Sequence, residues 1–485
     1  MPRIRPNALR LLASVTALLA LASLLPAAPI AARSPQPEAW RARPTIVLLV
    51  IDDMAQVGRE VWERMPTIGP LFLDQGVVFP RAIGNDPLCC PGRATLLTGL
   101  RSVDHGVVDN DARLFDPRVT LATELRAEGY RTGLFGKYLN DVALLADRTP
   151  PGWDRVVTGD LYYDTTWFVD GTPVRIGTAP EDYTTDRIRR SAEAFIDRAG
   201  ADRPLFLLLS PFAVHDGKDE TGVEVGPGIP VPAPRHRGDA RCQGLDRWQT
   251  PAHTDTDETD LPAFQRAVDT DAYADGWDLV PACETLLSVD ELVAGVADRL
   301  RATGRKNVLW VLVADNGMGW GKHGWALKRT PHALPQPLMI AWPRSAEIEP
   351  RSIPITVSTL DVAPTICAAA GCRMGPFPDG SRVSGVDLLP LLTGERDRLG
   401  REVLPMERTA GQTWGRITAR VPSWSGVWTT ERFLLGRWLY VRYRTGGEEL
   451  YDVDADPFLT VNRAADPTVA ATREALIAAW RVLQR

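Results

Sequence analysis

The chain is poor in histidine and cysteine, with six of each among 485 residues, and it carries no cluster of lysine and arginine. Its formal net charge is −6. A chain without a basic patch has no electrostatic footprint for nucleic acid or for an anionic membrane surface. Internal repeats and low-complexity tracts are also missing, so the 40 glycines and 40 prolines point to many loops in a folded protein.

A hydrophobic run long enough to cross a membrane is missing as well. The apolar run from Leu11 to Leu25 is shorter than the roughly 20 residues of a membrane span. Arginines precede this run and small residues follow it, which is the order of a secretory signal peptide. We expect residues 1–32 to be a signal peptide, and the protein to be exported, periplasmic or secreted, without stable membrane insertion. An uncleaved anchor is the alternative.

The few cysteines fit an oxidising compartment, where pairing is expected. The pairs that their spacing allows are Cys367 with Cys372, and Cys242 with Cys283. This pairing leaves Cys89 and Cys90 unbridged and available for chemistry. A disulfide from one of these two residues to another cysteine is the alternative, because sequence alone does not fix connectivity.

Buried strands and helices alternate along most of the chain, which predicts an α/β layered core. The expected strands are 45–52, 131–135, 205–210 and 307–314, and the expected helices are 120–129, 183–199 and 284–303. Residues 216–275 are rich in Pro, Gly and Asp and indicate a long surface insertion. We expect a catalytic domain over 33–394 and a smaller C-terminal α+β subdomain over 395–485, with an antiparallel sheet and a closing helix.

One short motif stands out between the first two strands. Leu88 is followed by Cys89 in a C-x-P-x-R pattern, and Leu-Thr-Gly comes shortly afterwards. Pro91 suits the first turn of a helix. Cys89 is then expected at the helix N-terminus, where free N–H groups favour an anion, and Arg93 is one turn further on. A structural cysteine pair beside a helix start is the alternative for this motif alone.

Acidic and amide side chains follow two of the predicted strands. Asp52 and Asp53 end the first strand, and Asp315 and Asn316 end the strand 307–314. Ligands of open α/β sheets bind at the carboxyl ends of strands. Four oxygen-bearing side chains at this edge predict a site for Ca²⁺ or Mg²⁺. Each pair taken alone is usually a cap or a turn.

Cationic and histidine side chains also follow the strands. Lys137 and Lys328 are candidates to hold an anionic nucleophile or substrate oxygen. His215 comes just after the strand 205–210 and is a candidate proton donor to a leaving oxygen. His323 is a weaker acid/base candidate. A solvated or structural role is the alternative for each of these residues alone.

In this order, the motifs D-D, C-x-P-x-R, G-K-Y, His, D-N-G and Lys resemble the type I, formylglycine-dependent sulfatase family over most of the mature chain. The segment Gly136 to Asn140 is most similar to the branch that contains N-acetylglucosamine-6-sulfatase. The resemblance implies the alkaline-phosphatase-like fold: a large, mixed and mostly parallel central sheet flanked by helices, then a smaller C-terminal antiparallel sheet with a helix.

The resemblance also implies roles for the motif residues. A formylglycine-generating enzyme converts Cys89 to formylglycine, whose hydrate attacks sulfur. Arg93 and Lys137 steady the hydrate, and His215 and Lys328 engage the leaving-group oxygen. Ca²⁺ is the expected ion, with Mg²⁺ possible. The ligands implied by the family, besides the formylglycine at position 89, are Asp52, Asp53, Asp315 and Asn316.

Three residues depart from the family pattern. Gly92 stands where Ser or Ala is usual, and Leu100 replaces a common Arg. Asn140 stands where many arylsulfatases have a His that deprotonates the hydrate. If Asn140 occupies that position, another group must act as the base, and His323 is our hypothesis for it.

These observations predict hydrolysis of a sulfate monoester of a sulfated small molecule or glycan, with a carbohydrate sulfate as the expected substrate. A phosphonate monoester or phosphodiester hydrolase of the same superfamily is the first alternative. An inactive relative that binds sulfated glycans is the second. A conventional alkaline phosphatase is disfavoured because it needs a Ser or Thr nucleophile and more histidines for zinc.

Overall fold

A computed structural model describes residues 43–484 except 146, 201, 256, 267–270, 346, 410–420 and 431–435. The predicted signal peptide, residues 1–32, lies outside the described residues. Within them, no helix combines the length and the apolar character that a membrane crossing requires.

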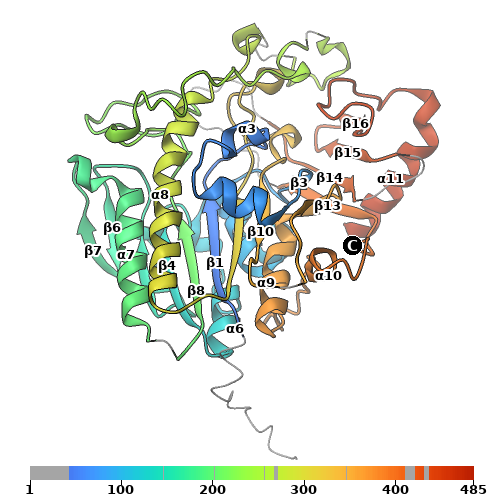
Figure 1. Ribbon diagram of the computed structural model, residues 1–485. Helices are drawn as coiled ribbons and strands as arrows, with labels where there is room; N and C mark the ends of the chain where they lie inside the picture. Colours follow the sequence, from blue (N-terminus) through green and yellow to red (C-terminus); the bar gives the residue numbers. More distant parts are fainter. Residues whose placement is uncertain are drawn as a thin grey trace, which may run out of the picture. The chain divides into compact units, whose positions relative to one another are not determined.

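A large mixed sheet forms the centre of the described chain (Figure 1). Its strands, in spatial order, are β11 (Arg351–Ser352), β2 (Gly76–Val78), β10 (Leu338–Ala341), β9 (Val308–Ala314), β1 (Thr45–Ile51), β8 (Leu205–Ser210), β4 (Arg131–Gly136), β5 (Arg155–Thr158), β6 (Thr166–Val169) and β7 (Thr172–Arg175). The adjacent strands β9, β1, β8, β4 and β5 are parallel. The strands β10, β6 and β7 run antiparallel to their neighbours. The predicted mixed, mostly parallel sheet is confirmed.

Strand β1 shows why the central strands are apolar without alternation. Ile46, Leu48 and Val50 contribute to one hydrophobic core, and the intervening residues Val47 and Leu49 contribute to the other. A strand buried on both faces needs apolar residues at every position. The continuous apolar run of β1 therefore indicates a sheet that is covered by a helical layer on each side.

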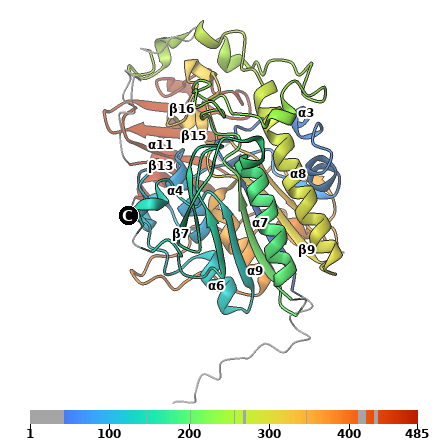
Figure 2. The same cartoon turned by 90° about the vertical axis from the view of Figure 1, so that its left-hand side faces the viewer.

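The two helical layers are visible in Figures 1 and 2, with α7 and α8 together on one face. The main helices are α4 (Cys89–Thr98), α6 (Leu121–Ala127), α7 (Thr184–Arg198), α8 (Val280–Ala302) and α9 (Val362–Ala370). Short helical turns are α3 (Arg59–Trp62), α5 (Ser102–His105) and α10 (Leu389–Leu392). Residues of α4, α6 and α9 belong to the core opposite α7 and α8.

Local sequence explains several element boundaries. Thr120 caps α6 by accepting a hydrogen bond from the Thr123 backbone N–H, and the Thr123 hydroxyl accepts one from the Thr120 N–H. Asp170 and Gly171 join β6 to β7 with φ values of 46° and 80°. Positive φ at both central residues is the geometry of a tight hairpin turn.

A smaller antiparallel sheet follows the large one in the chain. Its strands are β13 (Val403–Arg408), β14 (Trp424–Thr429), β15 (Trp438–Tyr443) and β16 (Glu448–Asp452). Helix α11 (Ala470–Leu483) packs on it through Leu476 and Ile477. The predicted C-terminal sheet with a helix is confirmed, while the boundary between 394 and 395 stays a prediction. Strand β3 (Ala82–Ile83) precedes the C-x-P-x-R motif in the chain and pairs with β12 (Val357–Ser358) in a two-stranded parallel sheet.

The segment 216–275 forms loops with single helical turns in its described parts, drawn in light green in Figure 1. The turns are Pro234–His236, Pro251–His253, Glu258–Asp260 and Asp271–Tyr273. A disulfide from Cys242 to Cys283 ties this segment to α8. A second disulfide closes the short loop from Cys367 to Cys372. Both predicted pairs are confirmed, and Cys89 and Cys90 are free.

Candidate active site

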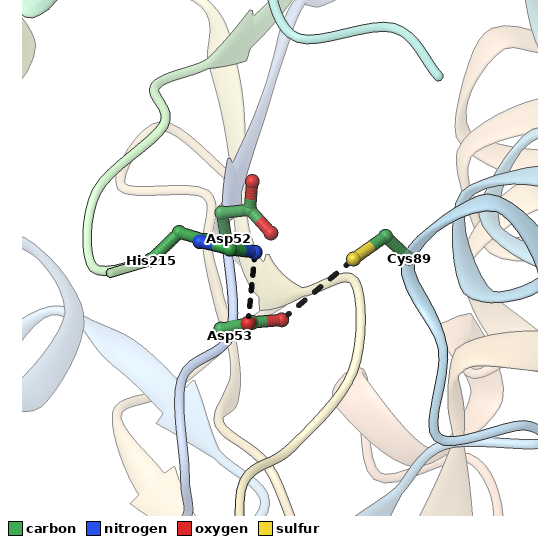
Figure 3. A group of neighbouring side chains, drawn as sticks. All are labelled: Asp52, Asp53, Cys89 and His215. Carbon is green, nitrogen blue, oxygen red and sulfur yellow. Dashed lines mark hydrogen bonds and ion pairs between the residues drawn. The ribbon is translucent and has the colours of Figure 1, made fainter. Parts of the chain in front are cut away.

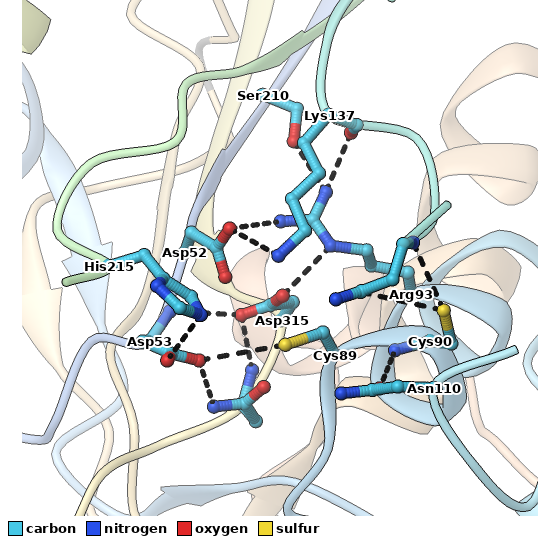
Figure 4. Close-up of polar contacts among 12 residues, drawn as sticks. Asp52, Asp53, Cys89, Cys90, Arg93, Asn110, Lys137, Ser210, His215 and Asp315 are labelled. Atoms are coloured by element: carbon cyan, nitrogen blue, oxygen red, sulfur yellow. Dashed lines mark hydrogen bonds and ion pairs between the residues drawn. The ribbon is translucent and has the colours of Figure 1, made fainter. Parts of the chain in front are cut away.

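The candidate site lies where two strand ends meet the start of a helix (Figure 4). Asp52 and Asp53 follow β1, and Asp315 follows the neighbouring parallel strand β9. Cys89 is the first residue of α4 and is fully buried. Parallel strands bring their carboxyl ends to one sheet edge, so these residues converge although more than half of the chain separates them.

Direct hydrogen bonds join the two strand ends. The Asp53 backbone has φ 60°, a left-handed conformation uncommon outside glycine. Its N–H donates to Asp315 Oδ1 at 3.1 Å, and Asn316 Nδ2 donates to Asp53 Oδ1 at 2.8 Å. Such backbone conformations persist where surrounding contacts enforce them, often at functional sites. Asp53, Asp315 and Asn316 therefore lie in one hydrogen-bonded cluster, and Asp52 is the neighbour of Asp53 in the chain.

Two buried cations, Arg93 in α4 and Lys137 directly after β4, balance the charge of the carboxylates. Lys137 Nζ donates to Asp52 Oδ2 at 2.6 Å, and Arg93 Nε donates to Asp315 Oδ2 at 2.8 Å. Arg93 Nη1 also donates to the Lys137 carbonyl and to Ser210 Oγ, both at 2.7 Å. Burial alone raises the pKa of Asp52, but the charges of Lys137 and Arg93 outweigh it and hold that pKa below its usual value.

Lys328 reaches the thiol of Cys89. Its Nζ lies 2.8 Å from Cys89 Sγ and forms an ion pair with Asp53. The same ammonium lies 3.3 Å from Asn316 Oδ1. Burial opposes the charge of Lys328, but the Asp53 carboxylate raises its pKa, so the ammonium stays charged. A fixed positive charge beside position 89 suits an anionic nucleophile or substrate.

His215 points into the same cluster, as Figure 3 shows. Its Nε2 lies 3.3 Å from Asp53 Oδ2, and its Nδ1 lies 2.8 Å from Asp216 Oδ1. The ring stacks on Phe212 with centroids 4.6 Å apart. Burial disfavours the imidazolium, but Asp53 and the bond to Asp216 outweigh it and raise the pKa of His215 well above its usual value. The contacts with Asp53 and Asp216 therefore hold the ring of His215 in one orientation, and the two carboxylates favour its protonated form.

The cluster fits a hard divalent cation. One ligand atom from each of Asp52, Asp53, Cys89 and His215 lies within 4.8 Å of the others. Oδ1 of Asp52 is buried and has no hydrogen-bond partner among the described residues. The two adjacent carboxylates, one of which keeps an oxygen without a hydrogen-bond partner among the described residues, suit a hard cation such as Ca²⁺ or Mg²⁺.

His323 differs from the other candidates because its contacts lie outside this cluster. Its ring contacts that of His332, tilted by 43° with centroids 4.2 Å apart, and its Nδ1 lies 3.8 Å from Asp255 Oδ2. Burial lowers the pKa of His323 well below its usual value. Asn140 contacts the neighbouring thiol: its N–H donates to Cys90 Sγ at 3.1 Å. The structure thus does not bring His323 to Cys89, and its role as a base stays a prediction.

Two further residues of the site were not singled out from the sequence. Asp216 orients His215, and Ser210 accepts a hydrogen bond from Arg93. Asp216 directly follows His215, so a carboxylate beside the candidate acid was the available signal. Ser210 carries no such signal, because a serine at a strand end is common.

Gly92 allows α4 to approach the end of β9 closely. A Cβ at this position would lie 2.0 Å from the Asp315 carbonyl oxygen. We expect Gly92→Ala to lower the free energy of unfolding by about 1–3 kcal/mol, because the helix must move away from Asp315. Chemical denaturation measures this change.

Gly295 in α8 provides the matched control for Gly92. Its nearest atom to an added Cβ is the carboxylate end of Glu193, a flexible side chain. We expect Gly295→Ala to be neutral or stabilising, because alanine favours a helix over glycine. A Gly92→Ala protein as stable as the wild type would contradict the proposed close packing.

Solved structures of other proteins share the fold described above. A solved protein in complex with its substrate D-glucosamine-2-N,6-O-disulfate has a TM-score of 0.67 and 20% identity, covering 91% of this chain and 97% of that chain. The phosphonate monoester hydrolase of Agrobacterium radiobacter has a TM-score of 0.65 and 21% identity, covering 91% and 95%. At these identities the likeness concerns the fold.

Sequence comparison gives the family. The sulfatase family model matches residues 44–372. The chain therefore belongs to the sulfatase family. It is 26% identical to N-acetylglucosamine-6-sulfatase of Homo sapiens over 377 residues, which cover 73% of this chain and 65% of the human protein. The match thus spans slightly less than two thirds of that relative's length.

Proposed function

We propose that the protein is exported and hydrolyses a sulfate monoester, R–O–SO₃⁻, to the alcohol and sulfate, and that R is a carbohydrate. The observation that carries this proposal is the position of Cys89. This residue starts a helix, contacts Lys328 at 2.8 Å and faces the Asp52, Asp53 and Asp315 cluster. A nucleophile between a cation and an acidic pocket suits attack on an anionic ester.

Two groups complete the site in this proposal. Asp52, Asp53, Asp315 and Asn316 would hold Ca²⁺, which supplies Lewis-acid polarisation of an ester oxygen. Formylglycine formed from Cys89 would supply a hydrated aldehyde as the nucleophile. The two disulfides fit export, because maturation and disulfide formation both belong to the secretory route in this proposal.

The remaining steps belong to residues of the chain. Arg93 and Lys137 keep Asp315 and Asp52 charged and in place. Lys328 binds the anionic ester beside position 89. His215 carries a proton on Nε2, donates it to the oxygen of the departing alcohol, and is held in that orientation by Asp216. Each role uses a contact that exists before substrate arrives, so little reorganisation is needed.

The carbohydrate assignment is supported by relatives. The human relative that the chain resembles is an N-acetylglucosamine-6-sulfatase, and one structural neighbour binds a sulfated glucosamine. The loop segment 216–275 begins directly after His215, so it can supply contacts to a sugar.

A matched pair of substrates tests the reaction. We expect matured enzyme with calcium to hydrolyse an aryl sulfate with a kcat/KM at least about tenfold above that for the corresponding aryl phosphonate monoester. Rates of phenol release measure both reactions. A preference for the phosphonate would move the assignment to a phosphonate monoester hydrolase. If protein with verified formylglycine at position 89 hydrolyses neither substrate, the result would favour an inactive protein that binds sulfated glycans.

A further inference from the structure

Arg408, the last residue of β13, buries a guanidinium group that has no hydrogen-bond partner among the described residues. The side chain is 1% exposed, and its three guanidinium nitrogens have no hydrogen-bond partner among the described residues. Buried polar groups are nearly always paired, and a buried unpaired charge is costly. The guanidinium of Arg408 therefore offers several N–H donors that a ligand could bind.

One side of Arg408 faces the segment that ends in the active-site lysine. In the sheet, Arg408 is the register partner of Trp424 on β14. The Trp424 indole N–H donates to the carbonyl of Arg329 at 2.9 Å. Arg329 directly follows Lys328, whose Nζ lies 2.8 Å from Cys89 Sγ. The C-terminal sheet therefore brings Arg408 to the border of the proposed active site.

The other side of Arg408 faces the segment that leads to Cys89. The Glu407 N–H donates to the Asn85 carbonyl at 2.9 Å. Asp86, the next residue along, accepts a hydrogen bond from the Leu88 N–H immediately before Cys89. Arg408 thus lies between the two segments that carry the proposed nucleophile and its cation.

The charges around Arg408 call for an anion. Burial and the Arg408 charge lower the pKa of Arg329 although Asp109 opposes this, so the two guanidinium groups repel each other here. Burial raises the pKa of Asp86 to about 7 despite the opposing charge of Arg408, so this carboxyl is an incomplete counter-charge. An anionic ligand between the two arginines would relieve the repulsion and accept hydrogen bonds from the guanidinium of Arg408.

We propose that Arg408 and Arg329 form a second anion-binding subsite beside Lys328, which recognises an acidic group of the substrate other than the hydrolysed sulfate. This inference rests on the proposed function and narrows its substrate class to saccharides with at least two anionic groups. The second group is a further sulfate on the same sugar or the carboxylate of an adjoining uronic acid, since both accept bidentate hydrogen bonds from arginine.

Ligand binding to a variant that lacks the proposed nucleophile distinguishes a second sulfate from a uronic acid carboxylate as the recognised group. In the Cys89→Ala background with calcium, calorimetry would compare three ligands: N-acetylglucosamine 6-sulfate, glucosamine N,6-disulfate, and a uronic acid–N-acetylglucosamine 6-sulfate disaccharide. We expect one doubly acidic ligand to bind at least about tenfold more tightly than the monosulfate. The better ligand identifies sulfate or carboxylate as the recognised group. Equal affinity for all three would overturn the proposal.

Variants of the arginines test whether they cause the preference. Arg408→Met should erase the tenfold advantage and leave monosulfate binding unchanged, and Arg329→Met should reduce the advantage too. The exposed Arg442 on β15 is the matched control, and Arg442→Met should retain the full preference. A loss shared equally by all three ligands in the Arg408→Met protein would overturn the proposal.

Thermal unfolding separates a binding role from a structural one. Arg408→Met removes a buried charge that has no hydrogen-bond partner among the described residues, so its Tm should equal or exceed that of the wild type. A lower Tm together with a retained ligand preference would show a structural role and overturn the proposal. Hydrolysis of the monosulfate by matured wild-type enzyme is measured separately, so absence of turnover would reject the proposed function while the binding data still decide on the subsite.

Discussion

Replacing Cys89 by alanine is expected to reduce kcat/KM for an aryl sulfate by at least about 10⁴-fold. The nucleophile at position 89 derives from this side chain in our account, and neither Lys328 nor His215 can replace it. The fold should remain intact, because the thiol is buried but unbridged and makes one short contact, to Lys328. Initial rates with matured protein, together with the circular dichroism spectrum, check both expectations.

The adjacent cysteine is the matched control. Cys90 is equally buried, but its sulfur contacts Asn140 and not the acidic cluster. We expect Cys90→Ala to keep most of the sulfatase activity, because position 90 is a variable position of the C-x-P-x-R motif. Loss of activity in Cys90→Ala with full activity in Cys89→Ala would reverse the assignment of the two residues.

Replacing Arg93 by methionine is expected to lower the free energy of unfolding by about 3–5 kcal/mol and to abolish sulfate hydrolysis. The substitution removes the ion pair to Asp315 and the nearby charge that faces Asp52, and it leaves both carboxylates buried. The stability loss should be larger with a chelator than with saturating calcium, because a bound cation offsets the buried negative charges that the substitution leaves uncompensated. Urea denaturation under the two conditions measures this difference.

Ser210 offers the control for Arg93. Ser210→Ala removes one hydrogen-bond acceptor of the guanidinium and leaves its carboxylate partners in place. We expect a loss of about 1 kcal/mol and retained hydrolysis. An Arg93→Met protein whose stability loss is no greater than that of Ser210→Ala, or is the same with and without calcium, would contradict the proposed charge balance.

The local sequence pattern was sufficient to predict the strands and helices that build the core. The apolar runs of β1, β8 and β9 are buried on both faces, so every position carries the signal of a central parallel strand. The acidic cluster was also predictable, because Asp52, Asp53 and Asp315 follow strands whose carboxyl ends must share one edge. The functional roles of these residues remain predictions.

Other features depend on contacts that no local pattern reveals. His323 follows closely on Asp315 in the chain, yet its ring contacts that of His332 and faces the loop segment at Asp255. Arg408 lies far along the chain in a different sheet, and it reaches the proposed site through the contacts of β13 with Asn85 and of Trp424 with Arg329. Loop paths and packing between sheets decide both positions, and neither leaves a periodic trace in the sequence.

The most direct test of the central claim is a mass spectrum of the tryptic peptide from Ala82 to Arg93, taken from protein that hydrolyses an aryl sulfate. We predict a species about 18 Da lighter than the thiol form, trapped by an aldehyde reagent at position 89. The fraction of this species should scale with the specific activity of the preparation. An active preparation in which Cys89 is entirely an unmodified thiol would contradict the account.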